Sequence, residues 1–170
     1  MELLRLIWWL APAGVANMVP PLVAKVWPKW TAPIDGGLKW RGKRIFGDHK
    51  TIRGLVTGVV VGSVVFLIQK YWWKVVDYNN LPVYTGFLMA SGALVGDCVK
   101  SFFKRQWGVK SGNSWFPWDQ IDWILGFMLF LWPVYQTPLF EAIELIVLAV
   151  GLHVVVRAVG YWIKINDKLI

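Results

Sequence analysis

The segment GALVGDCVKSFFKRQWGVKSGNSWFPWDQID, residues 92–122, begins inside one apolar run, ends at the start of the next and carries closely spaced acidic and basic side chains. Asp97, Lys100, Ser101 and Lys104 follow one another at i, i+3, i+4 and i+7, so they share one face if the segment is helical. A charged side chain in the middle of a membrane costs roughly 2.5–3.5 kcal/mol on insertion scales. We therefore expect this face to line a site rather than to contact lipid.

Two further carboxylates stand at the start of the next apolar run. Asp119 and Asp122 are spaced i and i+3, and with Asp97 they provide three oxygen ligands beside basic side chains. Carboxylate oxygens are the ligands that Mg²⁺ prefers, and Mg²⁺ in proteins is commonly held together with substrate phosphates. The segment therefore predicts a site for Mg²⁺ and a polyphosphate where a membrane meets water.

The composition of the whole chain indicates an integral membrane protein. Of its 170 residues 56% are hydrophobic, 13 are Trp, and the mean hydropathy is +0.49. The net charge of +8 favours anionic lipid and nucleotide as partners rather than nucleic acid, because most of the cations lie in two loops between apolar runs. Cys98 is the only cysteine, which excludes an internal disulfide and a cysteine-rich metal site.

The apolar runs predict a single all-α membrane domain, residues 1–170, with five transmembrane helices. A cleaved signal peptide is the competing interpretation of the first run, but its apolar character continues well beyond the Ala11-Pro12-Ala13 pattern. Glycines spaced by four residues, as in Gly92-xxx-Gly96, predict close helix packing and also permit a homodimer. The expected spans are residues 3–26, 52–69, 83–99, 121–135 and 140–163, with functional loops at 27–51 and 100–120.

The distribution of cations predicts the orientation. With five spans, fifteen Lys and Arg residues fall on one side of the membrane and three on the other. The positive-inside rule makes the fifteen-cation side cytoplasmic, so we expect the amino terminus outside and the carboxyl terminus inside. The protein is then a multi-pass protein of the cell membrane whose active site faces the cytoplasm.

The loop at 27–51 alternates glycines with cations and so resembles a phosphate-handling loop. The alternative is an anchor that contacts lipid headgroups. Asp35, followed by two glycines, and Asp48, preceded by one, argue against a simple anchor, which needs neither acids nor tight turns. His49 contacts phosphate or is solvated, and the sequence leaves the roles of Asn17, His153 and Arg157 open.

Three motifs in order carry a family resemblance: PIDGG followed by RGKRIFGDHKTIRG, then GALVGDCVKSFFKR, then SWFPWDQIDWILG. With the apolar runs between them they resemble the archaeal CDP-archaeol synthase family, relatives of the bacterial CDP-diacylglycerol synthases, over nearly the whole chain. The wider superfamily commonly has Arg where this chain has Gln120. The resemblance implies transfer of CMP from CTP to digeranylgeranylglyceryl phosphate, an unsaturated dialkyl ether glycerol phosphate, with Mg²⁺ as cofactor and release of pyrophosphate.

The resemblance also implies roles for the charged residues. We expect Asp97 and Asp119 to bind the metal ion, with Asp122 as a third ligand or as a partner of the ligands. Ser101 orients a phosphate or caps a helical turn, and Asp35 and Asp48 either contact the nucleotide or hold a cation of the loop. The expected catalytic residues are Asp97, Lys100, Lys104, Asp119 and Asp122, and those expected to bind CTP and the lipid phosphate are Asp35, Lys43, Arg44, Asp48, Lys50, Ser101 and Arg105, with Lys100 and Lys104.

Three other functions stay open at this point. A CDP-diacylglycerol synthase would act on phosphatidic acid with the same chemistry. A noncatalytic headgroup-binding protein accounts for the cations but not for three spaced acids. A transport protein requires charges along a path between both faces of the membrane, whereas here they gather on one side.

Overall fold

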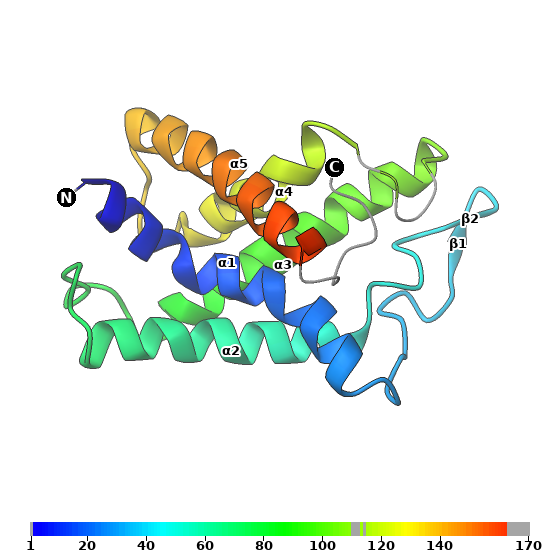
Figure 1. Ribbon diagram of the computed structural model, residues 1–170, viewed down its shortest axis with the longest axis horizontal. Helices are drawn as coiled ribbons and strands as arrows, with labels where there is room; N and C mark the ends of the chain where they lie inside the picture. Colours follow the sequence, from blue (N-terminus) through cyan, green and yellow to red (C-terminus); the bar gives the residue numbers. More distant parts are fainter. Residues whose placement is uncertain (1, 110–112, 114, 163–170) are drawn as a thin grey trace.

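Five helices and one small hairpin make up the part of the chain that the structure, a computed structural model, describes: residues 2–109, 113 and 115–162 (Figure 1). The hairpin projects from one end of the helical bundle, called the hairpin end below (Figure 1). The elements are α1 (Glu2–Val26), β1 (Lys39–Trp40), β2 (Lys43–Arg44), α2 (Ile52–Tyr71), α3 (Thr85–Gln106), α4 (Trp118–Leu131) and α5 (Leu139–Trp162).

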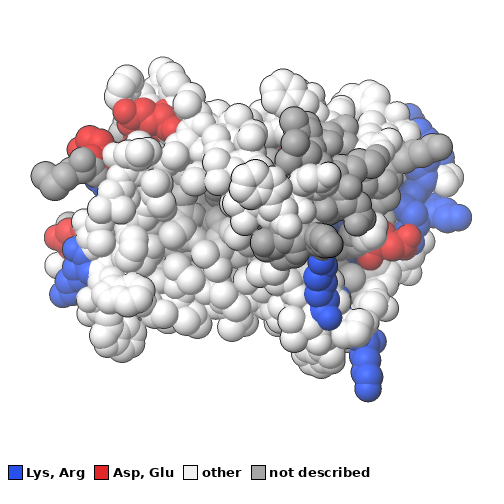
Figure 2. All heavy atoms as spheres, viewed as in Figure 1, with Lys and Arg blue, Asp and Glu red and all other residues white. Residues whose placement is uncertain are grey.

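Four of these helices are long and apolar enough to cross a membrane: α1, α2, α3 and residues 139–156 of α5. The expected helical membrane architecture is thereby confirmed to the extent of four candidate spans. Helix α4 has 14 residues, a rise of about 21 Å against a hydrocarbon core of about 30 Å, so a fifth crossing stays a prediction. Figure 2 shows charged side chains toward the two ends of the molecule and an uncharged band between them.

The helix ends differ from the expected ones where the charged residues lie. Helix α3 continues to Gln106 rather than ending near residue 99, and α4 begins at Trp118 rather than near residue 121. Hydropathy locates only the apolar part of a helix. The polar last turns of α3 and first turn of α4 are helical as well, because their charged side chains pair with charges on the neighbouring helix. The charged residues expected in a loop are therefore helical. Residues 110–112 and 114 of that loop, and the expected end of the last span at residue 163, lie outside the described residues.

Glycines set the closest helix approaches, as the four-residue spacing predicts. A Cβ on Gly62 of α2 would lie 2.6 Å from the Pro12 carbonyl oxygen of α1. Between α3 and α4, a Cβ on Gly96 would lie 2.2 Å from the Asp122 carbonyl oxygen, and one on Gly126 would lie 2.1 Å from that of Gly92. These faces are filled within the chain, so a homodimer, which stays a prediction, would need a different surface.

The connection between α1 and α2 is an ordered segment with a hairpin that the sequence did not predict. Strands β1 and β2 pair antiparallel around Arg41 and Gly42, whose φ angles of 49° and 79° are those of a tight hairpin turn. Two backbone hydrogen bonds close the base of the segment, Ile34 N to Lys50 O at 2.8 Å and Ile52 N to Ala32 O at 2.9 Å. These bonds join the two ends of the segment and hold Lys50 just before the first residue of α2.

Candidate active site

The charged face of α3 lies against the first turns of α4. Asp97, Lys100, Ser101 and Lys104 share that face, as their spacing predicts, and Lys100 and Lys104 contact acids of α4. Contact is close because Gly96, next to Asp97, lets the α3 backbone approach the Asp122 carbonyl group. One helix thus supplies an acid and two ammonium groups, and the other supplies two acids.

A single ammonium group lies between the three carboxylates. Lys100 Nζ is 3.0 Å from Asp97 Oδ1, 2.9 Å from Asp119 Oδ1 and 3.1 Å from Asp122 Oδ2. The lysine side chain is 14% exposed, and the three acids are 5–17% exposed. The predicted metal-binding acids are therefore brought together, and in this structure a lysine lies among them.

Two further ammonium groups neutralise the same acids. Lys104 Nζ donates to both oxygens of Asp119, at 3.1 and 2.9 Å, and the Trp115 backbone N–H donates to Asp119 Oδ2 at 2.6 Å. From the loop, Lys50 donates to Asp97 Oδ2. Three carboxylates and three ammonium groups balance in charge, which lowers the cost of burying them at the end of an apolar bundle.

Asp122 differs from the other two acids. Among the described residues its one ion-pair partner is Lys100, whose Nζ lies 3.1 Å from Oδ2, whereas Asp97 and Asp119 each contact a second ammonium group. A buried carboxylate with a single cationic partner fits a site for a further cation. No three acidic, His or Cys side chains of the described residues have the arrangement of an open metal site. By their chemistry Asp97, Asp119 and Asp122 fit Mg²⁺, once Lys100 is withdrawn from between them.

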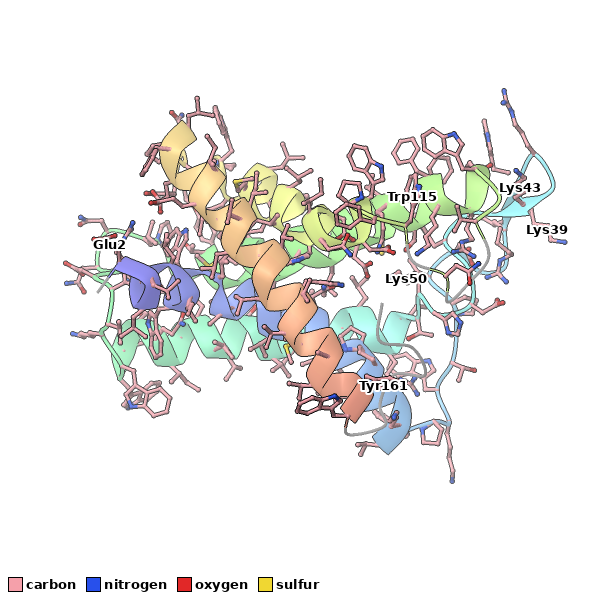
Figure 3. All side chains as sticks on the ribbon, turned by 45° about the horizontal axis from the view of Figure 1, so that its top comes forward. Glu2, Lys39, Lys43, Lys50, Trp115 and Tyr161 are labelled. Atoms are coloured by element: carbon pink, nitrogen blue, oxygen red, sulfur yellow. The ribbon has the colours of Figure 1, made fainter. Side chains whose placement is uncertain are left out.

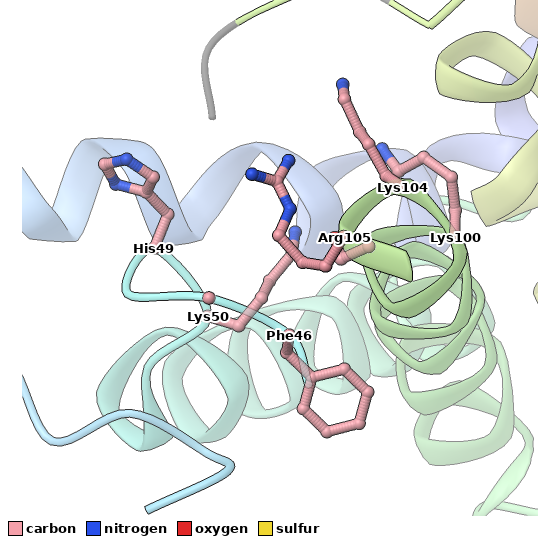
Figure 4. A pocket seen from close by; sticks show the side chains of 8 residues that line it. Phe46, His49, Lys50, Lys100, Lys104 and Arg105 are labelled. Carbon is pink, nitrogen blue, oxygen red and sulfur yellow. The ribbon is translucent and has the colours of Figure 1, made fainter. Parts of the chain in front are cut away.

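A cationic pocket opens beside these acids (Figure 4). Its volume of about 170 Å³ is below the roughly 300–1,000 Å³ of sites that enclose a whole ligand, so it suits part of one. No acid lines it, and its cations come from both the loop and α3, so its chemistry suits an anion. The lining residues are Phe46, Gly47, His49, Lys50, Lys100, Ser101, Lys104 and Arg105.

Four predicted phosphate- or nucleotide-binding residues do not line this pocket. Arg44 pairs with Asp35 at 2.7 Å and with Asp48, while Lys43 donates to the Gln106 carbonyl oxygen at the end of α3, at 2.6 Å. Lys43 and Lys50 both lie at the hairpin end (Figure 3). These contacts organise the loop and fasten it to α3.

Asp35 is the organising acid of the loop. It is 6% exposed and accepts hydrogen bonds from the backbone N–H groups of Gly37, Phe46 and Gly47, at 3.0, 2.9 and 3.3 Å, besides the Arg44 guanidinium. Burial acts to raise the pKa of Asp35, but these hydrogen bonds outweigh it and lower the pKa to about 2. Of the two roles considered for Asp35, holding a loop cation is the one these contacts support.

Sequence reasoning missed several groups at the site. Phe46 and Gly47 line the pocket, and the φ of 93° at Gly47 favours glycine. The Trp115 N–H and the Gln106 carbonyl group act through the backbone, and such groups leave no signal in residue types. Asn17 and His153 are half-buried on α1 and α5, and the side chain of Arg157 lies outside the described residues.

Comparisons with known proteins agree on one family. A family model described as CarS-like CDP-archaeol synthase matches residues 1–169. The CDP-archaeol synthase of Pyrococcus furiosus is 34% identical over 163 residues, covering 95% of each chain, and that of Methanoculleus marisnigri is 40% identical over 145 residues, covering 79% of this chain and 87% of the relative. A solved structure, described as an intramembrane enzyme for archaeal membrane lipids biosynthesis, has a TM-score of 0.76 at 30% identity and covers 91% of this chain and 93% of its own.

Proposed function

Because the chain belongs to the CarS-like CDP-archaeol synthase family, we propose that it transfers CMP from CTP to an unsaturated dialkyl ether glycerol phosphate, releasing pyrophosphate. The family match covers the chain almost end to end, and relatives with this name match it at 34–40% identity. The acceptor we propose is digeranylgeranylglyceryl phosphate, and the product is CDP-archaeol.

The observation that carries this proposal is the acid-free cationic pocket beside three largely buried acids. Lys50, Lys100, Lys104 and Arg105 line the pocket, and the three lysines also contact the acids. A polyphosphate requires such a cluster of cations, and an accompanying divalent ion requires the acids. Their location at one end of apolar helices suits the joining of a water-soluble nucleotide to a lipid.

The reaction needs little acid–base assistance. A phosphate monoester has a second pKa near 6, so the lipid phosphate is largely dianionic at neutral pH and is already a nucleophile. One of its oxygens attacks the α-phosphorus of CTP, the bond from that phosphorus to the bridging oxygen breaks, and pyrophosphate leaves with the electron pair. The task left to the protein is to hold two anions in line and to neutralise the leaving group.

The proposed roles of the residues follow from their positions. Lys50, Lys104 and Arg105 bind phosphate oxygens in the pocket, and Ser101 orients one of them. Lys104 and the Trp115 N–H also fix the direction of the Asp119 carboxylate. Asp97, Asp119 and Asp122 would hold Mg²⁺, which supplies charge neutralisation on the phosphate oxygens when it is bound.

The hairpin end is proposed to face the cytoplasm. The connection between α1 and α2 and the last turns of α3 lie at this end (Figure 1), and together they carry nine of the 18 Lys and Arg residues on which the positive-inside rule acts. This orientation gives the pocket direct access to CTP in the cytoplasm. It is tested by labelling a single cysteine introduced at Arg41, at the exposed hairpin tip, after Cys98→Ala, in inside-out and right-side-out vesicles.

Pyrophosphate release from the detergent-solubilised protein tests the reaction. The protein is given Mg²⁺, one of the four nucleoside triphosphates, and either the dialkyl ether glycerol phosphate, phosphatidic acid or no lipid. We expect release with CTP and the ether lipid only. Release with phosphatidic acid instead would identify a CDP-diacylglycerol synthase, and no release from folded protein under any pairing would refute the transferase proposal.

A further inference from the structure

We propose that Lys100 occupies the divalent-cation position while no nucleotide is bound, and leaves it only when nucleotide phosphates accept its ammonium group. The inference rests on the proposed function and adds to it a dependence of metal binding on nucleotide binding. Binding of the metal ion and binding of the nucleotide are then coupled. Lys100 must leave the acids before the metal ion can bind there, and the nucleotide phosphates accept the lysine that has left.

The first support is the position of the ammonium group. Lys100 Nζ lies 2.9–3.1 Å from one oxygen of each of three different acids. Lys50 and Lys104 contact only one acid each, Asp97 and Asp119. Lys100 alone among the described cations therefore stands where one metal ion would contact all three carboxylates.

The second support is the dependence of Asp122 on Lys100. Asp97 keeps Lys50, and Asp119 keeps Lys104 and the Trp115 N–H, if Lys100 moves away. Asp122 is 8% exposed and has no other cationic contact in the described part of the chain. Since an unpaired buried carboxylate is strongly destabilising, Lys100 cannot leave unless another cation arrives.

The third support is that Lys100 also lines the anion pocket. Lys100 and Lys104 extend from the same face of α3 at its rim, opposite Lys50 from the loop (Figure 4). The lysine side chain is a flexible four-carbon stem with three donors, so its ammonium group can exchange carboxylates for phosphate oxygens without movement of the helix. The exchange keeps every charge paired, because a divalent ion replaces the ammonium group at the acids.

This arrangement predicts weak metal binding by the nucleotide-free protein. A divalent ion that arrives alone must displace Lys100 into an anion pocket that holds no anion. Removing the lysine charge removes that competition, and by linkage it also removes much of the coupling between metal and nucleotide.

The test is Mn²⁺ binding to the folded, nucleotide-free protein in detergent, followed by the electron paramagnetic resonance signal of free Mn²⁺. We expect Lys100→Met to bind Mn²⁺ at least about tenfold more tightly than the wild type. Lys104→Met is the matched control: it also removes one ammonium group from the cluster but leaves Lys100 among the acids, so its gain should be clearly smaller. Equal or weaker Mn²⁺ binding by Lys100→Met overturns the proposal.

A second pair of variants decides the matter if Lys100→Met does not fold. Asp122→Asn alone and Asp122→Asn with Lys100→Met have the same two remaining acids and differ only in the lysine. We expect the double variant to bind Mn²⁺ about tenfold more tightly than the single one, and equal affinities overturn the proposal. Pyrophosphate release by the wild type is measured separately. The Mn²⁺ measurements can therefore refute the role of Lys100 while the transferase function stands, and an absence of pyrophosphate release can refute the transferase function independently of the Mn²⁺ result.

Discussion

Replacing Gly96 with alanine should separate the two helices that carry the site. The added Cβ would lie 2.2 Å from the carbonyl oxygen of Asp122 and 3.0 Å from its carbon, whereas ordinary contact begins at 3.4 Å, so α3 and α4 must move apart by about 1 Å. These two atoms and the third neighbour, Gly126 Cα at 3.2 Å, all belong to the backbone, so no side-chain rotation relieves the contact.

The displacement acts directly on the ion-pair cluster. Lys100 Nζ is 2.9 Å from Asp119 and 3.1 Å from Asp122, and a shift of about 1 Å brings both contacts to the limit of an ion pair. Overpacking of this kind typically costs about 1–3 kcal/mol of stability. A misplacement of about 1 Å between reacting groups costs roughly 100-fold in rate. We therefore expect Gly96→Ala to lower the melting temperature and to reduce pyrophosphate release by about two orders of magnitude.

Gly151→Ala provides the matched control. Gly151 lies in α5, and a Cβ added there would meet no atom of the described residues within 4 Å. This variant should keep the wild-type rate and melting temperature. Both variants are assayed below their melting temperatures for initial rates with CTP and the ether lipid. A Gly96→Ala protein indistinguishable from Gly151→Ala would refute the close approach of α3 and α4 and the positioning of the acids that depends on it.

Three further predictions address the acids and the metal ion. Asp119→Asn keeps the side-chain shape but removes the negative charge that Lys100 and Lys104 both contact. We therefore expect pyrophosphate release to fall by at least roughly 100-fold. Full activity in this variant would show that Asp119 is not a metal ligand. The lowered pKa of Asp35, about 2, means that its carboxylate stabilises the loop above a pH of about 4 and that this contribution is lost as the pH falls toward 2. Hydrogen exchange of residues 33–47 should therefore be faster in Asp35→Asn than in the wild type at neutral pH and should converge near pH 2; a difference that persists there contradicts the pKa assignment. Chelation of divalent ions with EDTA should abolish pyrophosphate release, and added Mg²⁺ should restore it. The melting temperature should change little, because Lys100 still neutralises the acids. Activity that survives chelation would refute the Mg²⁺ requirement.

The helical architecture was predictable because it rests on local properties. Long apolar runs favour helices that cross lipid, and glycines every four residues favour close helix packing. The spacing of Asp97, Lys100, Ser101 and Lys104 correctly predicted one helical face. The three family motifs predicted the family to which the comparisons assign the chain.

Features that depend on contacts between distant segments were not predictable. Both ends of the expected loop at 100–120 are helical, residues 100–106 in α3 and 118–120 in α4, since the lysines near the end of α3 pair with acids of α4. The hairpin has strands of two residues each, too short to produce a recognisable alternation. Arg44 and Asp35 suited phosphate and nucleotide by residue type, yet they pair with each other.

The membrane class, the helical architecture, the charged face of α3 and the family could be predicted because each depends on residue types at short spacing. Which charges neutralise one another depends instead on how the helices and the loop pack. The close approach at Gly96 puts Asp122 beside α3, the loop returns Lys50 to Asp97, and Lys100 lies among three acids contributed by two helices. Electrostatic energy in a desolvated site depends steeply on distances of a few ångströms, and those distances are set by packing between segments far apart in the chain.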